Sequence, residues 1–356
     1  MQPSARPADG AANRSTPGIE YMLIRRSILK RAEARRMSSG DVRRIVVGVP
    51  PAGAKVITAA LPKDLPVEIL ELPDSVDDFA SISAIEFLVL PLRVPDLVPQ
   101  LQDMQQLRVV QVLKAGYDRV EDHLPDLAQL CNARGSRDVA VSEWVMGALL
   151  GVFSGVVDAV AHQPRRQWIR TWRHELSGSK IVVVGMGPIG EAIVSRCEAF
   201  DMRVISFART ARGSILAVKD LPDHLGDADA VILITPLTNE TRGLMDASML
   251  ARMKDGALLI NAGRGPVVDV PALVNEVAAG RLRTVLDVYD SEPLPSDHPL
   301  WGLEGSFISP HIGGHTREGD IKSLNLAASQ ITRYVRGEPL KYVVGQGRGL
   351  PPRQTV

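Results

Sequence analysis

The sequence lacks the features of a secreted, membrane-spanning or nucleic-acid-binding protein. It has only two cysteines, Cys131 and Cys197, which excludes a disulfide framework and predicts two small core residues in a reducing compartment. Its 41 Lys and Arg residues balance 41 Asp and Glu residues, so the chain has no overall basic charge to attract nucleic acid. No apolar run approaches the length of a membrane span. We therefore expect a cytoplasmic protein with no membrane or nucleic-acid partner.

The length and composition fit a two-domain globular protein. The 356 residues suffice for two separate cores, and 45% hydrophobic with 23% charged residues are ordinary fractions. The first forty residues differ, because eight Arg and Lys residues there face only three acidic residues. We interpret residues 1–40 as a disordered or mis-assigned extension, in preference to an organelle transit peptide.

From Arg43 onward, short apolar runs alternate with helical stretches, which predicts an α/β fold of two doubly wound parallel-sheet domains. Polar stretches predict helices over 95–106 and 320–336. Residues 138–161 predict one long helix that is apolar on most faces and has to be buried between domains or subunits, which favours a homodimer. Strands are predicted at 45–49, 67–72, 87–92, 109–113, just before Asn132, and at 180–185, 203–207, 229–235, 256–261, 283–288 and 306–309.

A glycine-rich turn at 185–190 is the strongest local signal. The pattern G-x-G-x-x-G is weak alone, but here an apolar strand precedes it and an amphipathic helix follows it. The first glycine allows the tight turn, the second lets a pyrophosphate approach the backbone, and the third permits close packing of helix and strand. The phosphates of a dinucleotide are then expected at the helix N-terminus, on the turn residues Gly185, Met186, Gly187, Pro188, Ile189 and Gly190.

Three groups of polar residues follow predicted strands. In the first, Arg264 comes after Asn261, Ala262 and Gly263, where a planar guanidinium can bind a carboxylate with two hydrogen bonds. Taken alone, this arginine is as compatible with a solvated turn as with catalysis.

In the second group, Glu292 lies in a proline-ordered loop after the strand end at Asp287. In the third, His311 lies just beyond the last strand, two residues before Gly313. An isolated loop histidine is usually structural or merely exposed. His311 and His315 are four residues apart, as in a helical metal site, but the glycines between them argue against a helix, so no metal is expected.

Together these motifs resemble the D-isomer-specific 2-hydroxyacid dehydrogenase family, over about residues 43–345. The resemblance implies a Rossmann-type dinucleotide-binding domain (138–311) inserted in a flavodoxin-like substrate-binding domain (41–137 and 312–345), with 346–356 as a tail. It also implies a dimer.

The resemblance further implies the roles of single residues. Arg264 corresponds to the family's carboxylate-binding arginine, His311 to its acid/base and Glu292 to the partner of that histidine. Asp287 matches a residue that contacts the nicotinamide carboxamide. The remaining implied residues are the substrate loop Lys114, Ala115 and Gly116, and the cofactor-side residues Thr235, Pro236, Asn261, Ala262, Gly263 and Gly313.

These roles suit the reduction of a 2-oxo acid, which needs a hydride on the carbonyl carbon and a proton on its oxygen. A carboxylate beside an imidazole favours the protonated ring, and a guanidinium adds positive potential beside the developing alkoxide. Among the substrates known in the family we favour glyoxylate and hydroxypyruvate. The alternative is a binding protein, because some relatives on this fold are nucleotide-sensing transcriptional corepressors.

The cofactor is expected to be NADP in preference to NAD. An NAD enzyme should carry an acid about twenty residues after the glycines, to bind the ribose 2′-OH. This chain has Ala208 there, followed by Arg209, Thr210 and Arg212. The missing acid removes repulsion towards a 2′-phosphate, and the arginines can bind it.

Overall fold

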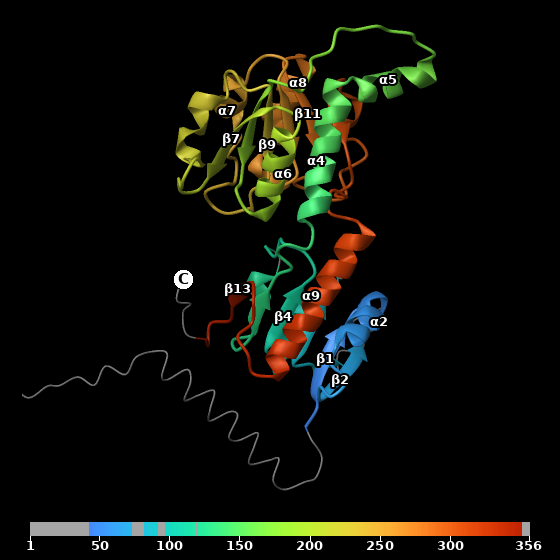
Figure 1. The fold of residues 1–356 in the computed structure, drawn as a ribbon, viewed down its shortest axis with the longest axis vertical. Coiled ribbons are helices and arrows are strands. Elements are labelled where there is room, and N and C mark those ends of the chain that lie inside the picture. Colours follow the sequence, from blue (N-terminus) through green and yellow to red (C-terminus); the bar gives the residue numbers. More distant parts are fainter. Residues whose placement is uncertain (1–42, 73–81, 92–96, 119, 351–356) are drawn as a thin grey trace, which may run out of the picture.

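The computed structural model describes residues 43–72, 82–91, 97–118 and 120–350 of the 356-residue chain. The described residues form two lobes, each built around one sheet (Figure 1). The chain passes from the first lobe to the second at residues 132–137 and returns at 309–316. The predicted extension at 1–40 and the end of the predicted tail, beyond Leu350, lie outside the described residues.

The first lobe contains a six-stranded sheet in the order β13-β5-β4-β3-β1-β2. Its central strands β3 and β4 are fully buried and, apart from Gln111, consist of Val, Leu and Phe, as parallel strands covered on both faces should. Five strands are parallel, and the last strand of the chain joins the edge antiparallel to β5. The strands are β1 (Ile45–Val49), β2 (Val67–Glu71), β3 (Phe87–Leu90), β4 (Val109–Val112), β5 (Gln129–Cys131) and β13 (Val343–Gln346).

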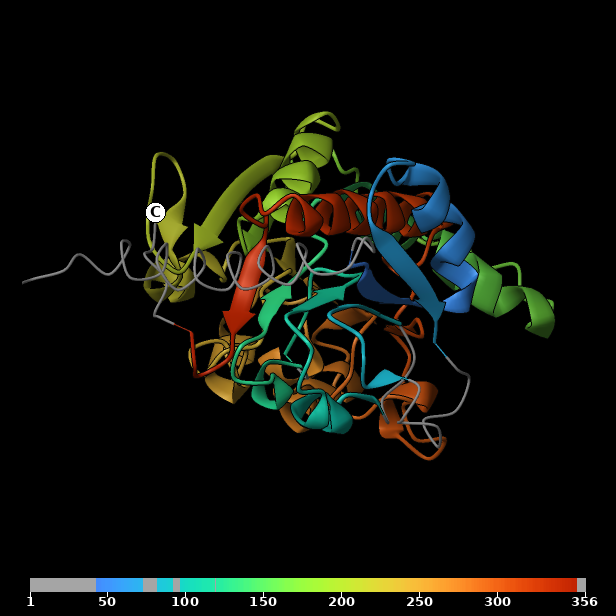
Figure 2. The same ribbon diagram turned by 90° about the horizontal axis from the view of Figure 1, so that it is seen from below.

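Two helices cover one face of this sheet. Figure 2 shows α2 (Pro51–Ala60) and α9 (Arg317–Val335) lying side by side across the strands. The side chain of Thr316 accepts a hydrogen bond from the Gly319 backbone N–H and caps α9, so this helix begins directly after the return crossing. The opposite face is covered by irregular chain that includes the short 3₁₀ helices η2 (Pro99–Asp103) and η3 (Glu121–His123).

The second lobe contains a fully parallel seven-stranded sheet in the order β12-β11-β10-β9-β6-β7-β8. The chain order reverses at β6, which lies between β7 and β9. Ligands of open α/β sheets bind at such a reversal, outside the carboxyl ends of the strands. The strands are β6 (Lys180–Val184), β7 (Arg203–Ala208), β8 (Leu216–Ala217), β9 (Ala230–Leu233), β10 (Leu258–Asn261), β11 (Arg283–Leu286) and β12 (Ser306–Ile308).

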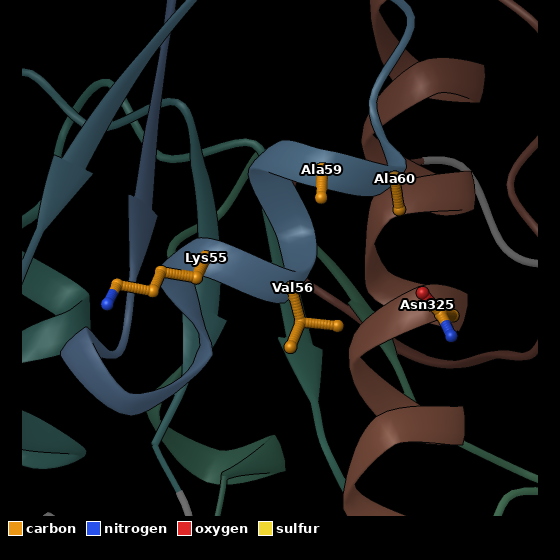
Figure 3. Close-up of a pocket in the computed structure, with 5 residues that line it drawn as sticks. All are labelled: Lys55, Val56, Ala59, Ala60 and Asn325. Atoms are coloured by element: carbon orange, nitrogen blue, oxygen red, sulfur yellow. The ribbon is translucent and has the colours of Figure 1, made fainter.

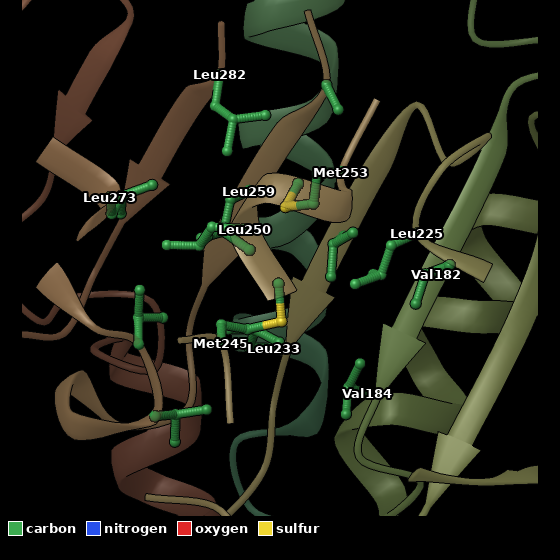
Figure 4. Close-up of a cluster of buried hydrophobic side chains, with 14 of the residues drawn as sticks. Val182, Val184, Leu225, Leu233, Met245, Leu250, Met253, Leu259, Leu273 and Leu282 are labelled. Carbon is green, nitrogen blue, oxygen red and sulfur yellow. The ribbon is translucent and has the colours of Figure 1, made fainter. Parts of the chain in front are cut away.

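Helices cover both faces of the second sheet. The helices α4 (Asp138–Phe153) and α6 (Pro188–Glu198) pack on one face, and α7 (Ala247–Arg252) with α8 (Val270–Ala278) on the other. Figure 4 shows the cluster beneath α7 and α8, where Leu250 and Leu273 meet Leu233 and Leu259 of the sheet. Each such side chain contributes about 1.5–3 kcal/mol when it is fully buried.

Both cysteines are core residues, as predicted. Cys131 is fully buried under α9, and Cys197 packs on Met146 with 3.9 Å between their sulfur atoms. Burial raises the pKa of the Cys197 thiol to about 12, so this thiol stays protonated and unreactive near neutral pH.

The predicted α/β class and the succession of parallel strands are confirmed, with strand boundaries that differ from the predicted ones by at most two residues. The helix predicted over 95–106 is wrong within the described residues, because the chain there forms only the short η2. Two strands were not predicted. β8 is only two residues long, and β13 is half-buried at a sheet edge, so neither produces an apolar run.

The single long helix predicted over 138–161 is also wrong. The chain forms α4 and then α5 (Val156–His162), separated at Gly155, which adopts a φ of 72°. The two helices meet at an angle of 65°. Only α4 is buried, whereas α5 exposes Val156 and Val160. Within the described residues no single helix has the length and apolar composition to cross a membrane, and the bent pair meets those two criteria only when both halves are counted together.

Candidate active site

The predicted functional residues gather at the carboxyl edge of the second sheet. Arg264 follows β10, Asp287 follows β11 and His311 follows β12, and these three strands are neighbours. Because the strands are parallel, their carboxyl ends open on the same side. The glycine turn follows β6, Thr235 follows β9 and Arg209 follows β7, so six adjacent strands supply this edge.

Arg264 reaches from the second lobe to the first. Its Nε donates to Asp118 Oδ2 at 2.6 Å, and its Nη1 donates to the carbonyl oxygen of Gly263 at 2.7 Å. A Cβ at Gly116 would overlap the Nη2 of Arg264, so the guanidinium lies directly on the Gly116 backbone. The predicted carboxylate-binding arginine and the predicted substrate loop are therefore in contact.

The turn that carries Arg264 is closed by Asn261. Its Nδ2 donates to the carbonyl oxygen of Arg264 at 2.9 Å, while its Oδ1 accepts from the Gly263 N–H at 3.0 Å. Ala262 and Gly263 lie in this turn, and a Cβ at Gly263 would come within 2.7 Å of the Thr235 carbonyl oxygen. The sequence predicted these residues as cofactor contacts, and the structure shows that they also shape the arginine turn.

The loop at Lys114–Gly116 is held by hydrogen bonds from the chain that follows β5. Asn132 Nδ2 donates to the Ala115 carbonyl oxygen at 2.8 Å, and the Ala133 N–H donates to the Lys114 carbonyl oxygen at 3.0 Å. Asn132 is buried, so this support is shielded from water. The loop is thus held on one side by Asn132 and Ala133 of the first lobe and contacted on the other by Arg264 of the second.

His311 and Glu292 form an ion pair or charge-assisted hydrogen bond. His311 Nδ1 lies 2.8 Å from Glu292 Oε2, and Glu292 Oε1 accepts from the Tyr289 N–H at 3.1 Å. The imidazole is about half exposed, with 46% of the side chain accessible, so a small ligand can reach it. His311 has a φ of 55°, a conformation that non-glycine residues rarely adopt unless their surroundings enforce it.

Asp287 provides much of that enforcement. Its carboxylate is 3% exposed and accepts from Ser309 Oγ at 2.6 Å and from the N–H groups of Ile312 and Gly313 at 2.8 Å each. The sequence predicted a cofactor contact for Asp287. The structure shows that its two oxygens already bind the residues on either side of His311.

Tyr289 is a further support that the sequence analysis missed. Its hydroxyl donates to the carbonyl oxygens of Leu286 at 2.7 Å and Ser309 at 3.1 Å, which ties the Glu292 loop to the His311 loop. Burial raises the pKa of Tyr289, so the phenol remains a donor at all physiological pH values. Both acceptors are backbone carbonyls, and Ser309 lies twenty residues away, so no side-chain pattern in the sequence indicates these bonds.

The glycine turn has the geometry of a phosphate cradle. Gly185 has a φ of 116°, and a Cβ there would lie 2.7 Å from the Ile234 carbonyl oxygen. A Cβ at Gly190 would overlap the carbonyl oxygen of Gly185, whereas at Gly187 it would meet nothing within 4 Å. Helix α6 begins at Pro188, and no side chain of the described residues caps it. The backbone N–H groups of its first turn therefore remain available to an anion.

The residues predicted to select the cofactor lie at the end of β7. Ala208 is the last residue of that strand, so no carboxylate stands there. Arg212 Nη2 donates to the carbonyl oxygen of Met186 in the glycine turn at 2.6 Å. Arg209 Nη1 lies 3.8 Å from Glu240 Oε2, both side chains being largely exposed, and Thr210 is exposed between the two arginines.

The buried hydroxyl of Thr235 is left without a hydrogen-bond partner among the described residues. Thr235 is 9% exposed and directly precedes Pro236, whose carbonyl oxygen accepts from Thr241 Oγ1 at 2.7 Å. A buried polar atom without a partner costs free energy, so its position beside the glycine turn fits a ligand that completes it.

No metal centre is found in the part of the chain that the structure describes. His311 and His315 both precede α9, which begins only at Arg317, so they do not share a helix face.

Two further features lie apart from these residues. Trp301 Nε1 donates to the Pro295 carbonyl oxygen at 2.8 Å. A shallow depression of about 440 Å³ between α2 and α9 is lined by Lys55, Val56, Ala59, Ala60 and Asn325, none of them a predicted site residue (Figure 3).

Comparison with known proteins agrees with this geometry. Residues 146–313 match the family model described as D-isomer specific 2-hydroxyacid dehydrogenase, NAD binding domain. The chain is 30% identical over 293 residues to a glyoxylate reductase of Thermofilum pendens, which covers 78% of this chain and 84% of the relative. It is 32% identical to glyoxylate/hydroxypyruvate reductase B of Salmonella schwarzengrund, over 67% of this chain and 78% of the relative.

Two solved structures extend the likeness to both lobes. A D-isomer specific 2-hydroxyacid dehydrogenase family protein of Aeromonas salmonicida superposes with a TM-score of 0.75 at 28% identity, over 85% of this chain and 98% of that one. An NADPH-dependent glyoxylate/hydroxypyruvate reductase of Sinorhizobium meliloti, in complex with NADP and sulfate, gives 0.73 at 25% identity over the same shares. The chain therefore belongs to the D-isomer specific 2-hydroxyacid dehydrogenase family and is an NAD(P)-dependent oxidoreductase.

Proposed function

We propose that the enzyme reduces a small 2-oxo acid of the glyoxylate or hydroxypyruvate class, with NADPH as cofactor. The observation that carries this proposal is the convergence of Arg264 and the His311–Glu292 pair at neighbouring strand ends, with the loop at Lys114–Gly116 against the guanidinium. Relatives named as glyoxylate and hydroxypyruvate reductases support the substrate class.

In this proposal the first lobe binds the acid and the second binds the cofactor. Arg264, with the backbone N–H groups of Lys114, Ala115 and Gly116, holds the substrate carboxylate between the lobes. Bound NADPH supplies the hydride for the carbonyl carbon. His311 donates a proton to the carbonyl oxygen, which becomes the hydroxyl of the product. Because Nδ1 faces Glu292, the Nε2 atom of the ring is the one turned to the substrate.

Three features of the second lobe support the binding of a dinucleotide: the glycine turn, the start of α6 and Thr235. The extended backbone at Gly187 leaves open space for a pyrophosphate, and the absence of Cβ at Gly190 lets the helix approach the turn. The uncapped start of α6 offers N–H donors to the phosphates. The buried Thr235 hydroxyl, which has no hydrogen-bond partner among the described residues, supports a polar contact to the cofactor on the same side.

NADPH is favoured because the end of β7 lacks an acid and carries Arg209 and Arg212. The exposed Arg209–Glu240 contact is weak, so Arg209 can exchange it for a 2′-phosphate. A 2-hydroxyacid dehydrogenase of Rhizobium etli, 27% identical and in complex with NADP, supports the same choice. Charge-assisted hydrogen bonds to the phosphate predict a preference of about 10- to 100-fold in kcat/KM for NADPH over NADH. A clear preference for NADH would contradict it.

The decisive experiment is a panel of small 2-oxo acids. Loss of the reduced nicotinamide absorbance is measured with glyoxylate, hydroxypyruvate, pyruvate and larger acids, each with NADPH and NADH. We expect the first two to be reduced fastest. If no acid is turned over while NADPH still binds, the nucleotide-sensing alternative replaces the reductase.

We further propose that the enzyme is a homodimer assembled through the segment that follows α4. Residues 156–177, here called the arm, carry Trp168 and Trp172 at 93% and 101% exposure. The base of the arm is fixed, because Asp158 pairs with Arg173 and with Arg283 of the second sheet at 2.7 Å each. An anchored segment that exposes two tryptophan side chains is suited to burial against a second copy of the chain. A cytoplasmic location remains a prediction.

A further inference from the structure

A buried guanidinium lies outside every motif discussed so far. Arg137 directly precedes α4, in the first crossing between the lobes, and is 8% exposed. Its Nη1 donates to the carbonyl oxygen of Gly314. Its Nη2 donates to Asp320 Oδ1 at 2.6 Å and makes a longer contact of 3.4 Å with the carbonyl oxygen of Leu113. One side chain therefore bonds to three segments, at Leu113, which lies 24 residues before it, and at Gly314 and Asp320, which lie 177 and 183 residues after it.

Two of those segments lead directly into the candidate active site. Leu113 immediately precedes Lys114, the first residue of the substrate loop. Gly314 is the third residue after His311, in the return crossing. The third segment is the first turn of α9, where Asp320 lies. Arg137 thus links the loop that faces the substrate carboxylate to the loop that carries the proton donor.

The packing around Arg137 makes this link close. A Cβ at Gly314 would lie 3.0 Å from Arg137 Cδ and 3.5 Å from Val141 Cγ2. A Cβ at Gly313 would lie 3.3 Å from the Trp144 ring. Arg137, Val141 and Trp144 are spaced by four and three residues, so they share one face of α4. The loop after His311 rests on that face, and larger residues at the two glycines would lift it.

We propose that Arg137 is a positioning residue that fixes the distance between the Lys114–Asp118 loop and the His311 loop. This inference rests on the proposed reductase function, because that reaction needs Arg264 and His311 on either side of one small acid. Arg137 touches neither substrate nor cofactor in this role. A planar guanidinium suits it, since its fork offers five N–H donors in fixed directions, whereas a lysine ammonium cannot hold three acceptors in this geometry.

The test compares Arg137→Met and Arg137→Lys with Arg281→Met. Arg281 is a matched control, because it is also mostly buried, pairs with Glu276 at 2.5 Å and donates to the carbonyl oxygens of Leu250 and Met253. It lies just before β11, at the opposite edge of the sheet from the site. Any general loss of stability from a missing arginine should appear in both methionine variants.

In Arg137→Met, we expect kcat/KM for the acid to fall while the Kd for NADPH stays nearly unchanged. In Arg137→Met, kcat/KM for hydroxypyruvate should fall about 100-fold, because a shift of roughly 1 Å between reacting groups has that effect. The Kd for NADPH, measured by protein fluorescence, should stay within about twofold, since its contacts lie in the second lobe. Arg137→Lys should recover part of the loss. Arg281→Met should keep both constants. Unchanged kcat/KM in Arg137→Met would overturn the inference.

A second readout does not depend on turnover. Backbone amide hydrogen exchange in the peptides that contain residues 114–118 and 312–316 should accelerate about tenfold in Arg137→Met and not in Arg281→Met. If the unaltered enzyme reduces none of the acids, the proposed function fails, and this exchange measurement still decides the role of Arg137. Equal protection of both loops in the two methionine variants would refute it.

Discussion

His311 is the residue on which the proposed chemistry depends most directly. Replacing His311 with alanine should lower kcat by about 10²–10⁴-fold, because a positioned proton donor contributes that much. NADPH binding should persist, because the imidazole is not part of the glycine turn that is proposed to bind the cofactor phosphates. Turnover and cofactor fluorescence measure the two effects separately. His315→Ala is the matched control, an exposed histidine four residues away that should retain full activity. Near-normal turnover in His311→Ala would remove His311 from the mechanism.

Arg264 is expected to act through its shape as well as its charge. Arg264→Lys keeps the charge but loses the planar fork that binds a carboxylate while contacting Asp118. Loss of one charge-assisted bond of about 1.5–3 kcal/mol predicts a fall of about 10- to 100-fold in kcat/KM for the acid. The KM for NADPH should change little. Steady-state kinetics with each substrate varied in turn decide the matter, and an unchanged KM for the acid would contradict carboxylate binding.

The sequence revealed site residues that belong to local motifs and missed those defined by distant contacts. Arg264 follows a strand and Gly263, and His311 follows a strand and shortly precedes Gly313, so their sequence neighbours indicate both residues. The pairing of Arg264 with Asp118 spans 146 positions, and that of Arg137 with Asp320 spans 183. Such pairs form only when the chain is folded and brings distant segments together. The burial of Asp287 beneath the His311 loop was hidden for the same reason.

At the scale of elements, buried parallel strands were predictable because burial on both faces requires unbroken apolar runs. β4 and β10 are examples, because every residue of both strands is buried and only Gln111 and Asn261 among them are polar. The break between α4 and α5 was not predictable from periodicity, because the residues on both sides of Gly155 remain apolar. The antiparallel β13 is only partly buried, so its pattern does not differ from that of a loop.

Two Gly→Ala substitutions, one at the break between α4 and α5 and one inside α4, should change the free energy of unfolding in opposite directions. Gly155→Ala should destabilise the fold by about 1 kcal/mol, because Gly155 has a φ of 72° and its missing Cβ makes room for the Arg173 guanidinium. Gly147→Ala, in the middle of α4 with nothing within 4 Å of the new Cβ, should stabilise it by about 0.5–1 kcal/mol. Urea unfolding measures both. A stabilised Gly155→Ala would mean that the helix can run straight.

At the scale of the whole molecule, the arm carries the most exposed large apolar side chains of the described residues, Trp168 and Trp172. If it docks on a second copy, replacing Trp168 and Trp172 together with serine should convert a dimer into a monomer. The two side chains are more than nine-tenths exposed in the single chain, so the change should leave the unfolding temperature of the monomer nearly unaltered. Light scattering coupled to gel filtration gives the mass directly. Trp301→Ser, at 54% exposure, is the control that should remain dimeric. An unaltered chain of monomeric mass would refute the proposal.

The passage of the chain between the lobes at two places has a mechanical consequence. A single connection would let one lobe swivel on the other in any direction. Two connections that touch, as they do where Arg137 meets Gly314, leave one hinge line along which turning is easy. Residues near that line stay almost still when the lobes rock, while the outer rims travel furthest. The widest opening is then available to an entering acid, and the least movement falls where the proton donor is supported.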